Sequence, residues 1–182
     1  MSIPALHARK LATSGVSGAG AARPLYFKNA LTTGLDGSIY VSGHTGGALD
    51  GQTNSVGDDA FLTKYSADGT KAWTKLLGSS GNEYDRALTT RLDGSIYVSG
   101  YTSGALDGQT NSGNVDAFLT KFSADGTKAW TKLLGSSGSD YAIALTTGLD
   151  GSIYVSGVTG GSLDGQTYSG GSYDAFLTKY SV

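Results

Sequence analysis

The stretch Ala30-Leu-Thr-Thr-Gly-Leu-Asp-Gly-Ser-Ile-Tyr-Val-Ser-Gly43 decides the fold of this chain. Near-identical stretches follow at residues 87–100 and 144–157, so the sequence repeats every 57 residues. Self-similarity at a fixed period indicates a repeat architecture, in which each unit packs mainly against its neighbours. We therefore divide the chain into a leader and three repeats, which are residues 1–29, 30–86, 87–143 and 144–182.

The composition of the 182 residues favours a strand-rich fold with many turns. The chain contains 29 glycines and only two prolines, and glycine in a helix interior costs about 1 kcal/mol relative to alanine. It has no cysteine, which excludes disulfides and thiolate metal sites. The formal net charge of −2 and the lack of a long apolar run predict neither nucleic-acid binding nor membrane insertion.

The second repeat predicts four antiparallel strands. Residues 87–92 and 95–102 alternate between apolar and polar positions, and Asp93-Gly94 separates them. Residues 116–122 and 127–135 form a second such pair, again around an Asp-Gly dipeptide. Asp-Gly is typical of two-residue hairpin turns, which demand positive φ angles. Each repeat is therefore expected to be a four-stranded meander, with strands a to d in chain order.

Both faces of this meander carry apolar side chains, so an isolated repeat would leave one of them in water. Stacking repeats side by side buries both faces, as in the blades of a β-propeller. Strand a would line the ring axis, and strand d would form the rim, where Trp73 and Trp130 cover the flank between blades. The alternative is a parallel β-solenoid, which the hairpin signals disfavour. We predict an all-β propeller with three blades per chain.

The number of strands predicts that another copy completes the ring. The pattern of strand d occurs only twice after a strand c, because just two residues follow the third strand c, residues 174–180. Residues 5–15 resemble a displaced strand d, since they share a leucine, basic residues and a Ser-Gly ending with residues 71–81. Propellers usually have about four to eight blades. We expect a six-bladed homodimer in which each leader completes the third blade of its partner.

Two alternatives to this dimer stay open. Higher oligomers would close larger rings from the same repeats. A designed chain, or a fragment of a longer propeller, would have no native task of its own, and the near-identity of the repeats favours this alternative.

Three motifs carry a resemblance to a known repeat family. They are Gly-Ser-Ile-Tyr-Val-Ser-Gly at 37–43, 94–100 and 151–157, Asp-Ala-Phe-Leu-Thr-Lys at 59–64, 116–121 and 174–179, and Ala-Asp-Gly-Thr-Lys-Ala-Trp at 67–73 and 124–130. Over residues 30–182 the chain resembles the bacterial SBBP β-propeller repeat, whose layout is similar to NHL-type blades. The resemblance implies an extracellular or cell-surface protein, although no signal peptide is visible. It implies no catalytic residues.

The long b–c and d–a connections share one face of the predicted ring, and the repeats differ most there. They are residues 46–58, 103–115 and 160–173, and residues 79–86 and 136–143. We expect a ligand surface on this face, because loops on a rigid scaffold commonly carry binding sites. Aromatic rings beside polar side chains suit stacking on sugars, although rings in propellers also pack between blades. The candidate residues are His44, Tyr84, Tyr101, Tyr141 and Tyr168.

Each b–c loop also carries Leu-Asp-Gly-Gln-Thr, which places oxygen donors at alternate positions. Calcium prefers such ligands, and it is the one cofactor that this motif admits. The loops lack the acid density of a dedicated calcium site, so capping of turns is the favoured interpretation. The residues concerned are Asp50, Gln52, Asp107, Gln109, Asp164 and Gln166.

The sequence offers little material for catalysis. The histidines His7 and His44 are not repeated, so no recurring Ser-His-Asp arrangement exists. A hydrolase or lyase would need acids at the ring axis, but strand a places threonines there. The repeated acids Asp59, Asp116 and Asp174 open strand c and are expected to anchor loops. We predict a non-enzymatic, self-assembling scaffold or adhesion module whose partner is a glycan or a surface protein, with a lectin as the alternative.

Overall fold

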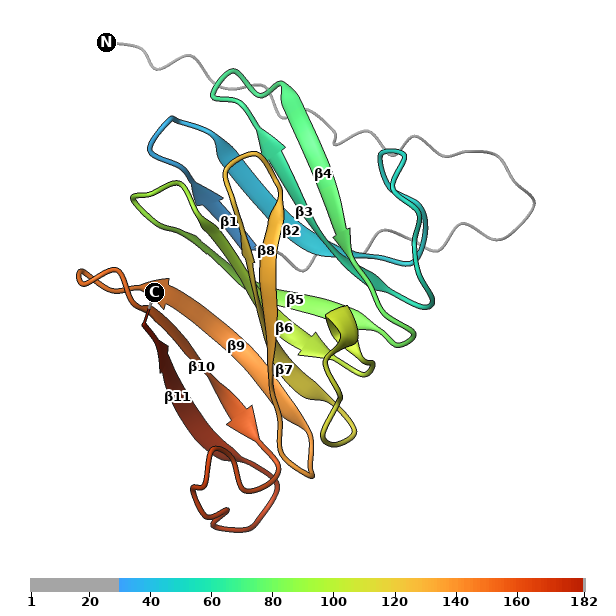
Figure 1. Ribbon diagram of the computed structural model, residues 1–182, viewed down its shortest axis with the longest axis vertical. Coiled ribbons are helices and arrows are strands. Elements are labelled where there is room, and N and C mark those ends of the chain that lie inside the picture. The colour runs from blue at the N-terminus through green and yellow to red at the C-terminus, as the bar shows by residue number, and fades with distance from the viewer. Residues whose placement is uncertain (1–29, 182) are drawn as a thin grey trace.

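The computed structural model describes residues 30–181, which form three antiparallel sheets that follow one another along the long axis of the molecule (Figure 1). The first sheet contains β1 (Ala30–Thr33), β2 (Ile39–Thr45), β3 (Asp59–Tyr65) and β4 (Lys71–Leu77). The second contains β5 (Glu83–Thr90), β6 (Ile96–Thr102), β7 (Asp116–Phe122) and β8 (Lys128–Leu134). The third contains β9 (Asp140–Thr147), β10 (Ile153–Thr159) and β11 (Asp174–Tyr180).

Every sheet is a meander, because neighbouring strands are consecutive in the chain. This confirms the predicted all-β class and the antiparallel repeat, and it rules out a parallel solenoid for the described residues. The helical structure within residues 30–181 is one 3₁₀ turn, Leu106–Gly108, and no helix there is long and apolar enough to span a membrane. The predictions for the leader, residues 1–29, fall outside the described residues.

Strand a is longer than the sequence predicted. β5 begins at Glu83 and β9 at Asp140, inside segments that were expected to be d–a loops. A bulge between Asp85 and Ala87 breaks the alternation of side chains but lets β5 continue its pairing with β6. The interruption of the period-2 pattern is the reason that the sequence indicated a loop where the chain is still a strand.

The hairpin turns also differ from the predicted two-residue type. The Gly34 amide donates to the Ser38 carbonyl, and the Gly37 amide donates to the Gly34 carbonyl at 3.1 Å. Gly37 has a φ of +77°, so the connection is a type I turn followed by a left-handed glycine. Asp36 accepts the Ser38 amide at 3.0 Å and so caps the turn. The same cap recurs in the equivalent turns of the other two repeats.

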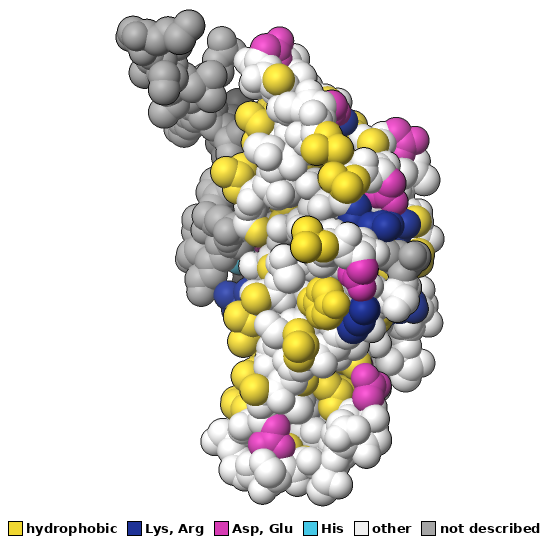
Figure 2. Space-filling view, turned by 90° about the vertical axis from the view of Figure 1, so that its left-hand side faces the viewer, with side chains coloured by type: hydrophobic (Ala, Val, Ile, Leu, Met, Phe, Trp, Pro, Cys, Tyr) yellow, Lys and Arg dark blue, Asp and Glu magenta, His cyan; other side chains and the backbone are white. Residues whose placement is uncertain are grey.

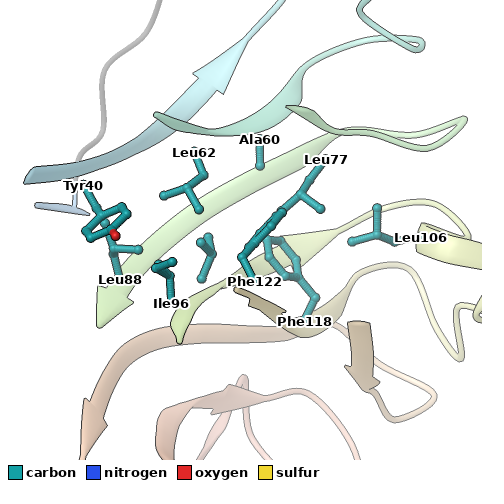
Figure 3. Close-up of a cluster of buried hydrophobic side chains, with 10 residues drawn as sticks. Tyr40, Ala60, Leu62, Leu77, Leu88, Ile96, Leu106, Phe118 and Phe122 are labelled. Carbon is teal, nitrogen blue, oxygen red and sulfur yellow. The ribbon is translucent and has the colours of Figure 1, made fainter. Parts of the chain in front are cut away.

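The hydrophobic core lies between the sheets and not within one of them. We call the face of a sheet that points to the next sheet its forward face, and the opposite face its rear face. The forward face of the first sheet packs on the rear face of the second (Figure 3). The buried residues are Tyr40, Ala60, Leu62 and Leu77 from the first sheet and Leu88, Ile96, Val98, Leu106, Phe118 and Phe122 from the second.

The second and third sheets repeat the same packing. Tyr97, Ala117, Leu119 and Leu134 on the forward face of the second sheet meet Ala142, Ile153, Val155 and Leu163 of the third. Trp73 and Trp130 lie at the outer ends of the two cores, with ring centroids 6.2 Å from Tyr40 and 6.0 Å from Tyr97. A Cβ on Gly126 of the next repeat would come within 3.0 Å of Trp73. The tryptophans therefore cover the flanks between sheets, as predicted.

Hydroxyl groups tie strand a of each sheet to strand a of the next. The Thr90 hydroxyl donates to the Thr33 carbonyl at 2.9 Å, and the Thr147 hydroxyl donates to the Thr90 carbonyl at 3.1 Å. Each bond joins a threonine to the same position one repeat earlier, so β1, β5 and β9 lie next to one another. Strand a is therefore an edge strand of each sheet and lies against strand a of the next sheet.

One buried carboxylate joins the first two sheets. Asp85 on β5 accepts a hydrogen bond of 2.6 Å from the Ser42 hydroxyl on β2. Its side chain is 1% exposed, and burial raises its pKa from 3.8 to about 7. The third sheet has Ala142 at the equivalent position, and the Ser99 hydroxyl, which corresponds to Ser42, has no hydrogen-bond partner. This contact therefore distinguishes the first interface between sheets from the second.

Asp85→Asn should make the thermal stability less dependent on pH. Because the pKa is higher in the folded state, the stabilisation from Asp85 is complete below its unfolded pKa and is lost as the pH rises through about 7. The melting temperature of the unaltered protein should fall between about pH 4 and 7, and that of the variant should fall less. Asp36→Asn is the control, because the pKa of Asp36 lies below this window. Equal pH slopes in all three proteins would contradict the prediction.

Candidate functional site

Five aromatic rings form a continuous row across the three sheets, at the end that carries the long loops. Successive ring centroids are 4.7 Å apart for His44 and Tyr84, and 5.2 Å apart for Tyr84 and Tyr101. The row continues from Tyr101 to Tyr141 at 4.8 Å and from Tyr141 to Tyr173 at 5.8 Å. These separations and the tilted or edge-on ring planes are those of favourable aromatic pairs. We call these five residues the aromatic row.

The strands, and not the loops, position most of this row. Tyr84 is the second residue of β5 and lies opposite Tyr101 in the pairing of β5 with β6. Tyr141 lies in β9, and His44 lies near the end of β2. The sequence placed Tyr84 and Tyr141 in d–a loops, and this was wrong because both strands begin earlier than predicted. The rings consequently stand on the rigid part of the fold and bridge one sheet to the next.

Charged and polar groups flank the aromatic row. The Tyr84 hydroxyl donates to the Asp58 carboxylate at 2.8 Å. The Arg86 guanidinium donates to the Tyr101 hydroxyl at 3.0 Å and lies 5.1 Å from the centroid of that ring. Apolar ring surface therefore stands beside a carboxylate, a guanidinium and several hydroxyls. This combination suits a ligand that has both C–H surface and hydroxyl groups.

The structure brings together four of the five predicted ligand residues, and it places the fifth elsewhere. Tyr168 lies in the third b–c loop, where its hydroxyl donates to the Gly171 carbonyl at 2.7 Å. Tyr173, which the sequence analysis missed, takes the end position of the row and is 48% exposed. It follows Gly170-Gly-Ser in the third b–c loop, which is one residue longer than the other two. That extra residue is the signal that would have drawn attention to this position.

The residues considered as calcium ligands have a different role in the first two sheets. Asp50 accepts hydrogen bonds from Lys71 and from Thr74 of β4, the latter at 2.6 Å. Asp107 accepts the equivalent bonds from Lys128 and Thr131 of β8. We call each such set an outer-strand clamp, because the aspartate of the b–c loop holds the fourth strand of its sheet.

The b–c loops that carry the clamp aspartates have a distinctive backbone geometry. Asp50 and Asp107 have left-handed backbones, with φ angles of +50° and +53°. The amides of Gln52 and Gln109 close their loops by donating to the carbonyls of Leu49 and Leu106. The aspartates thus hold a strand instead of capping a turn. Over residues 30–181, no group of three or more His, Cys, Asp or Glu side chains is placed to hold a metal ion.

The other repeated acids anchor loops, as the sequence indicated. Asp59, Asp116 and Asp174 accept the amides of Ser55, Ser112 and Ser169 at 2.8, 2.8 and 2.6 Å. Burial raises the pKa of Asp59 and of Asp116 despite these hydrogen bonds. Glu83, also buried, accepts hydrogen bonds from the Ser79 amide and the Thr102 hydroxyl. These carboxylates therefore accept hydrogen bonds from backbone amides of the adjacent loops and, for Glu83, from a strand hydroxyl.

The opposite face of the molecule carries the short turns and exposes a set of leucines. Figure 2 shows hydrophobic side chains from top to bottom of that face, among acidic and basic groups. Leu35, Leu92 and Leu149 occupy the same position in the three a–b turns, and each is more than three-quarters exposed. They border a depression of about 520 Å³ that Arg91 also lines. The sequence analysis treated these residues only as parts of turns.

Comparisons with known proteins add one relative. No protein-family model matches the chain. Regulatory protein FlaEY of Caulobacter vibrioides is 32% identical to it over 196 residues. The match covers 93% of this chain and 20% of that protein, so the chain spans about a fifth of the length of the curated relative that it matches.

Asp107→Gly should loosen β8 without disturbing β4. The substitution removes the acceptor of Lys128 and Thr131, and glycine tolerates the left-handed backbone at this position. Since a hydrogen bond to a charged group contributes about 1.5–3 kcal/mol, amide exchange in β8 should accelerate by about tenfold or more. Hydrogen–deuterium exchange with mass spectrometry measures this, and β4, held by Asp50, is the internal control. Unchanged exchange in β8 would show that the clamp does not hold the strand.

Proposed function

We propose that the chain is a non-enzymatic scaffold that pairs with a second copy to form a six-bladed β-propeller and presents the aromatic row as its binding surface. The exposure of one repeated leucine carries this proposal. Leu62 and Leu119 on the forward faces of the first and second sheets are 0% and 1% exposed. Leu177 holds the same position in the third sheet and is 70% exposed. A side chain that is core in two sheets is thus left in water in the third.

The rear face of the first sheet offers the complementary surface. It carries Ile39 and Val41, whose counterparts Ile96 and Val98 receive the forward face of the preceding sheet. Leu31 on the same face is 68% exposed, whereas its counterpart Leu88 is 8% exposed. The two outer faces of the chain therefore repeat the two halves of an interface that the chain already uses twice.

A two-fold pair satisfies both outer faces at once. The forward face of each third sheet would meet the rear face of the first sheet of the other copy, and six sheets lie within the usual range of propellers. The ladder of threonine bonds would continue in the same way, with the Thr33 hydroxyl of one copy donating to the Thr147 carbonyl of the other. Burial of the exposed leucines would drive this association.

Two observations support the non-enzymatic part of this proposal: the contacts of the threonines on strand a and the contacts of the buried acids. Thr33, Thr90 and Thr147 on strand a of the three sheets take part in hydrogen bonds between sheets. Glu83 and Asp59 lie in the long-loop half of the fold and accept hydrogen bonds from their own loops. A general acid or base needs a carboxylate that can reach a substrate, and these groups are committed to the fold.

Carbohydrate binding is the second candidate function, and the aromatic row favours it. Ring faces pack against the C–H surfaces of sugars, while Asp58 and Arg86 provide an acceptor and a donor for hydroxyl groups. An extracellular or cell-surface location, which the SBBP resemblance implies, would expose the row to glycans and to surface proteins.

Leu177→Asp should abolish the assembly. Multi-angle light scattering should give twice the chain mass of 18.5 kDa for the unaltered protein and a single chain mass for the variant at the same concentration. A charge on the forward face of the third sheet would be buried without a partner, which disfavours association. Val56→Asp, in an exposed part of a b–c loop, is the matched control and should remain a dimer. A monomeric unaltered protein would contradict the proposal.

Tyr173→Ala should weaken glycan binding by about fivefold or more, because one stacking ring contributes on the order of 1 kcal/mol or more. A glycan array on the assembled protein would identify the ligand, and calorimetry would then measure the affinities. Tyr168→Ala is the control, since this tyrosine lies in the same loop but outside the aromatic row. The lectin hypothesis would be rejected if the assembled protein bound no glycan, or if both variants lost affinity equally.

A further inference from the structure

We infer that the open edge of β11 is a slot for residues 10–13 of a second copy of the chain. The inference rests on the pairing of two copies proposed above, and it assigns the segment and the side chains that complete the third sheet.

The slot occupies the place of a missing fourth strand. β4 and β8 flank β3 and β7 in the first two sheets, whereas β11 is the last strand of the third sheet among residues 30–181. A pocket of about 260 Å³ lies beside it, and its lining includes Leu163, Asp164, Phe176 and Thr178. An edge strand of this kind presents unpaired amide and carbonyl groups, which another strand can join by β-augmentation.

The receptor side of the clamp is already formed at this slot. Asp164 has a φ of +49°, like the left-handed Asp50 and Asp107. A bridge between Leu163 and Gln166 closes its loop, as in the first repeat. Asp164 therefore has the backbone geometry of a clamp, although no lysine or threonine within residues 30–181 bonds to its carboxylate.

A threonine on β11 marks the position of a second contact. Thr63 and Thr120 each share a hydroxyl hydrogen bond of 3.0 Å with the clamp threonine of the adjacent outer strand. Thr178 is their counterpart in the third repeat and lines the pocket. The slot thus offers the Asp164 carboxylate as an acceptor for a lysine. A threonine three residues after that lysine could bond to both the Asp164 carboxylate and the Thr178 hydroxyl.

The sequence contains a third segment with this spacing. The clamps use Lys71 with Thr74 and Lys128 with Thr131, and Lys10-Leu-Ala-Thr13 is the one other Lys-x-x-Thr in the 182 residues. Three aspartate loops are therefore matched by three such segments. This register differs by five residues from the alignment of residues 5–15 with residues 71–81 on their Ser-Gly endings.

The order of strands identifies the sheet that this segment completes. β4 precedes β5 in the chain but belongs to the sheet before it, and β8 has the same relation to β9. A segment that precedes β1 would by the same rule complete the sheet before the first one. In the six-bladed pair that sheet is the third sheet of the other copy. Lys10 would then donate to Asp164, and Thr13 would bond to Asp164 and Thr178.

Mixing two single-cysteine proteins tests this exchange directly, because the chain has no cysteine of its own. Thr74 lies directly opposite Thr63 in the pairing of β3 with β4, so Thr13→Cys should lie opposite Thr178→Cys. Chains with Thr13→Cys and chains with Thr178→Cys, tagged to differ in mass, are refolded together and oxidised. We expect a disulfide-linked heterodimer as the main product on a non-reducing gel.

Ala12→Cys is the matched control for Thr13→Cys. Because side chains alternate along a strand, this residue would point to the other face, and its yield of heterodimer should be lower by about fivefold or more. Equal yields from Thr13→Cys and Ala12→Cys would overturn the assigned register.

Two further measurements separate the inference from the proposed function. If the Thr13→Cys/Thr178→Cys double variant formed its disulfide within one chain, the slot would take its own leader, and exchange would be overturned. If no disulfide forms in either experiment, light scattering on the unaltered protein distinguishes the two remaining explanations. A dimer would then overturn the slot assignment but leave the six-bladed pair standing, whereas a monomer would remove both.

Discussion

The whole structure depends on the fact that each sheet has two apolar faces and buries them against neighbouring sheets. A four-stranded meander has no internal core of its own, so its side chains become buried only when another meander lies on either side. The clusters around Leu62 and Leu119 show this, since each combines the forward face of one sheet with the rear face of the next. Stability is therefore shared between nearest neighbours, and the first and last sheets are each one neighbour short among the described residues.

The near-identity of the repeats makes the deviations informative. Core positions such as Tyr40 and Tyr97 are the same in successive repeats because they lie in equivalent packing environments between sheets. The substitutions between repeats that lie on strand a and near the long loops change the chemical character of the side chain instead. Asp85 gives way to Ala142, and His44 gives way to Tyr101. The aromatic row runs through this variable region, and four of its five rings stand on strands that the sheets hold in place. A rigid set of rings would need little further ordering to receive the proposed ligand.

The third sheet shows what the repeat looks like without its neighbours. Leu177 remains in water, and the loop around Asp164 keeps the left-handed backbone that its counterparts use to hold an outer strand. The exposed face of the third sheet has the same residues as faces that are buried between sheets in the same molecule. The proposed association of two copies would use contacts that the chain already forms twice between its own sheets. The third sheet has no following sheet and no fourth strand among residues 30–181. The exposed face around Leu177 and the unpaired edge of β11 therefore occur together.

The sequence by itself determined the period, the antiparallel strands, the positions of strands a and d at the edges of their sheets, and four of the five residues of the aromatic row. These follow from local signals: alternation along a strand, Asp-Gly turns and the recurrence of the same residues. Only the tertiary structure showed that Tyr84 and Tyr141 stand on strands, that Tyr173 and not Tyr168 ends the aromatic row, and that Asp50 holds β4. The reason is that a bulge, the contact between rings of adjacent sheets and a hydrogen bond across 24 residues depend on how the sheets stack, which no local pattern records.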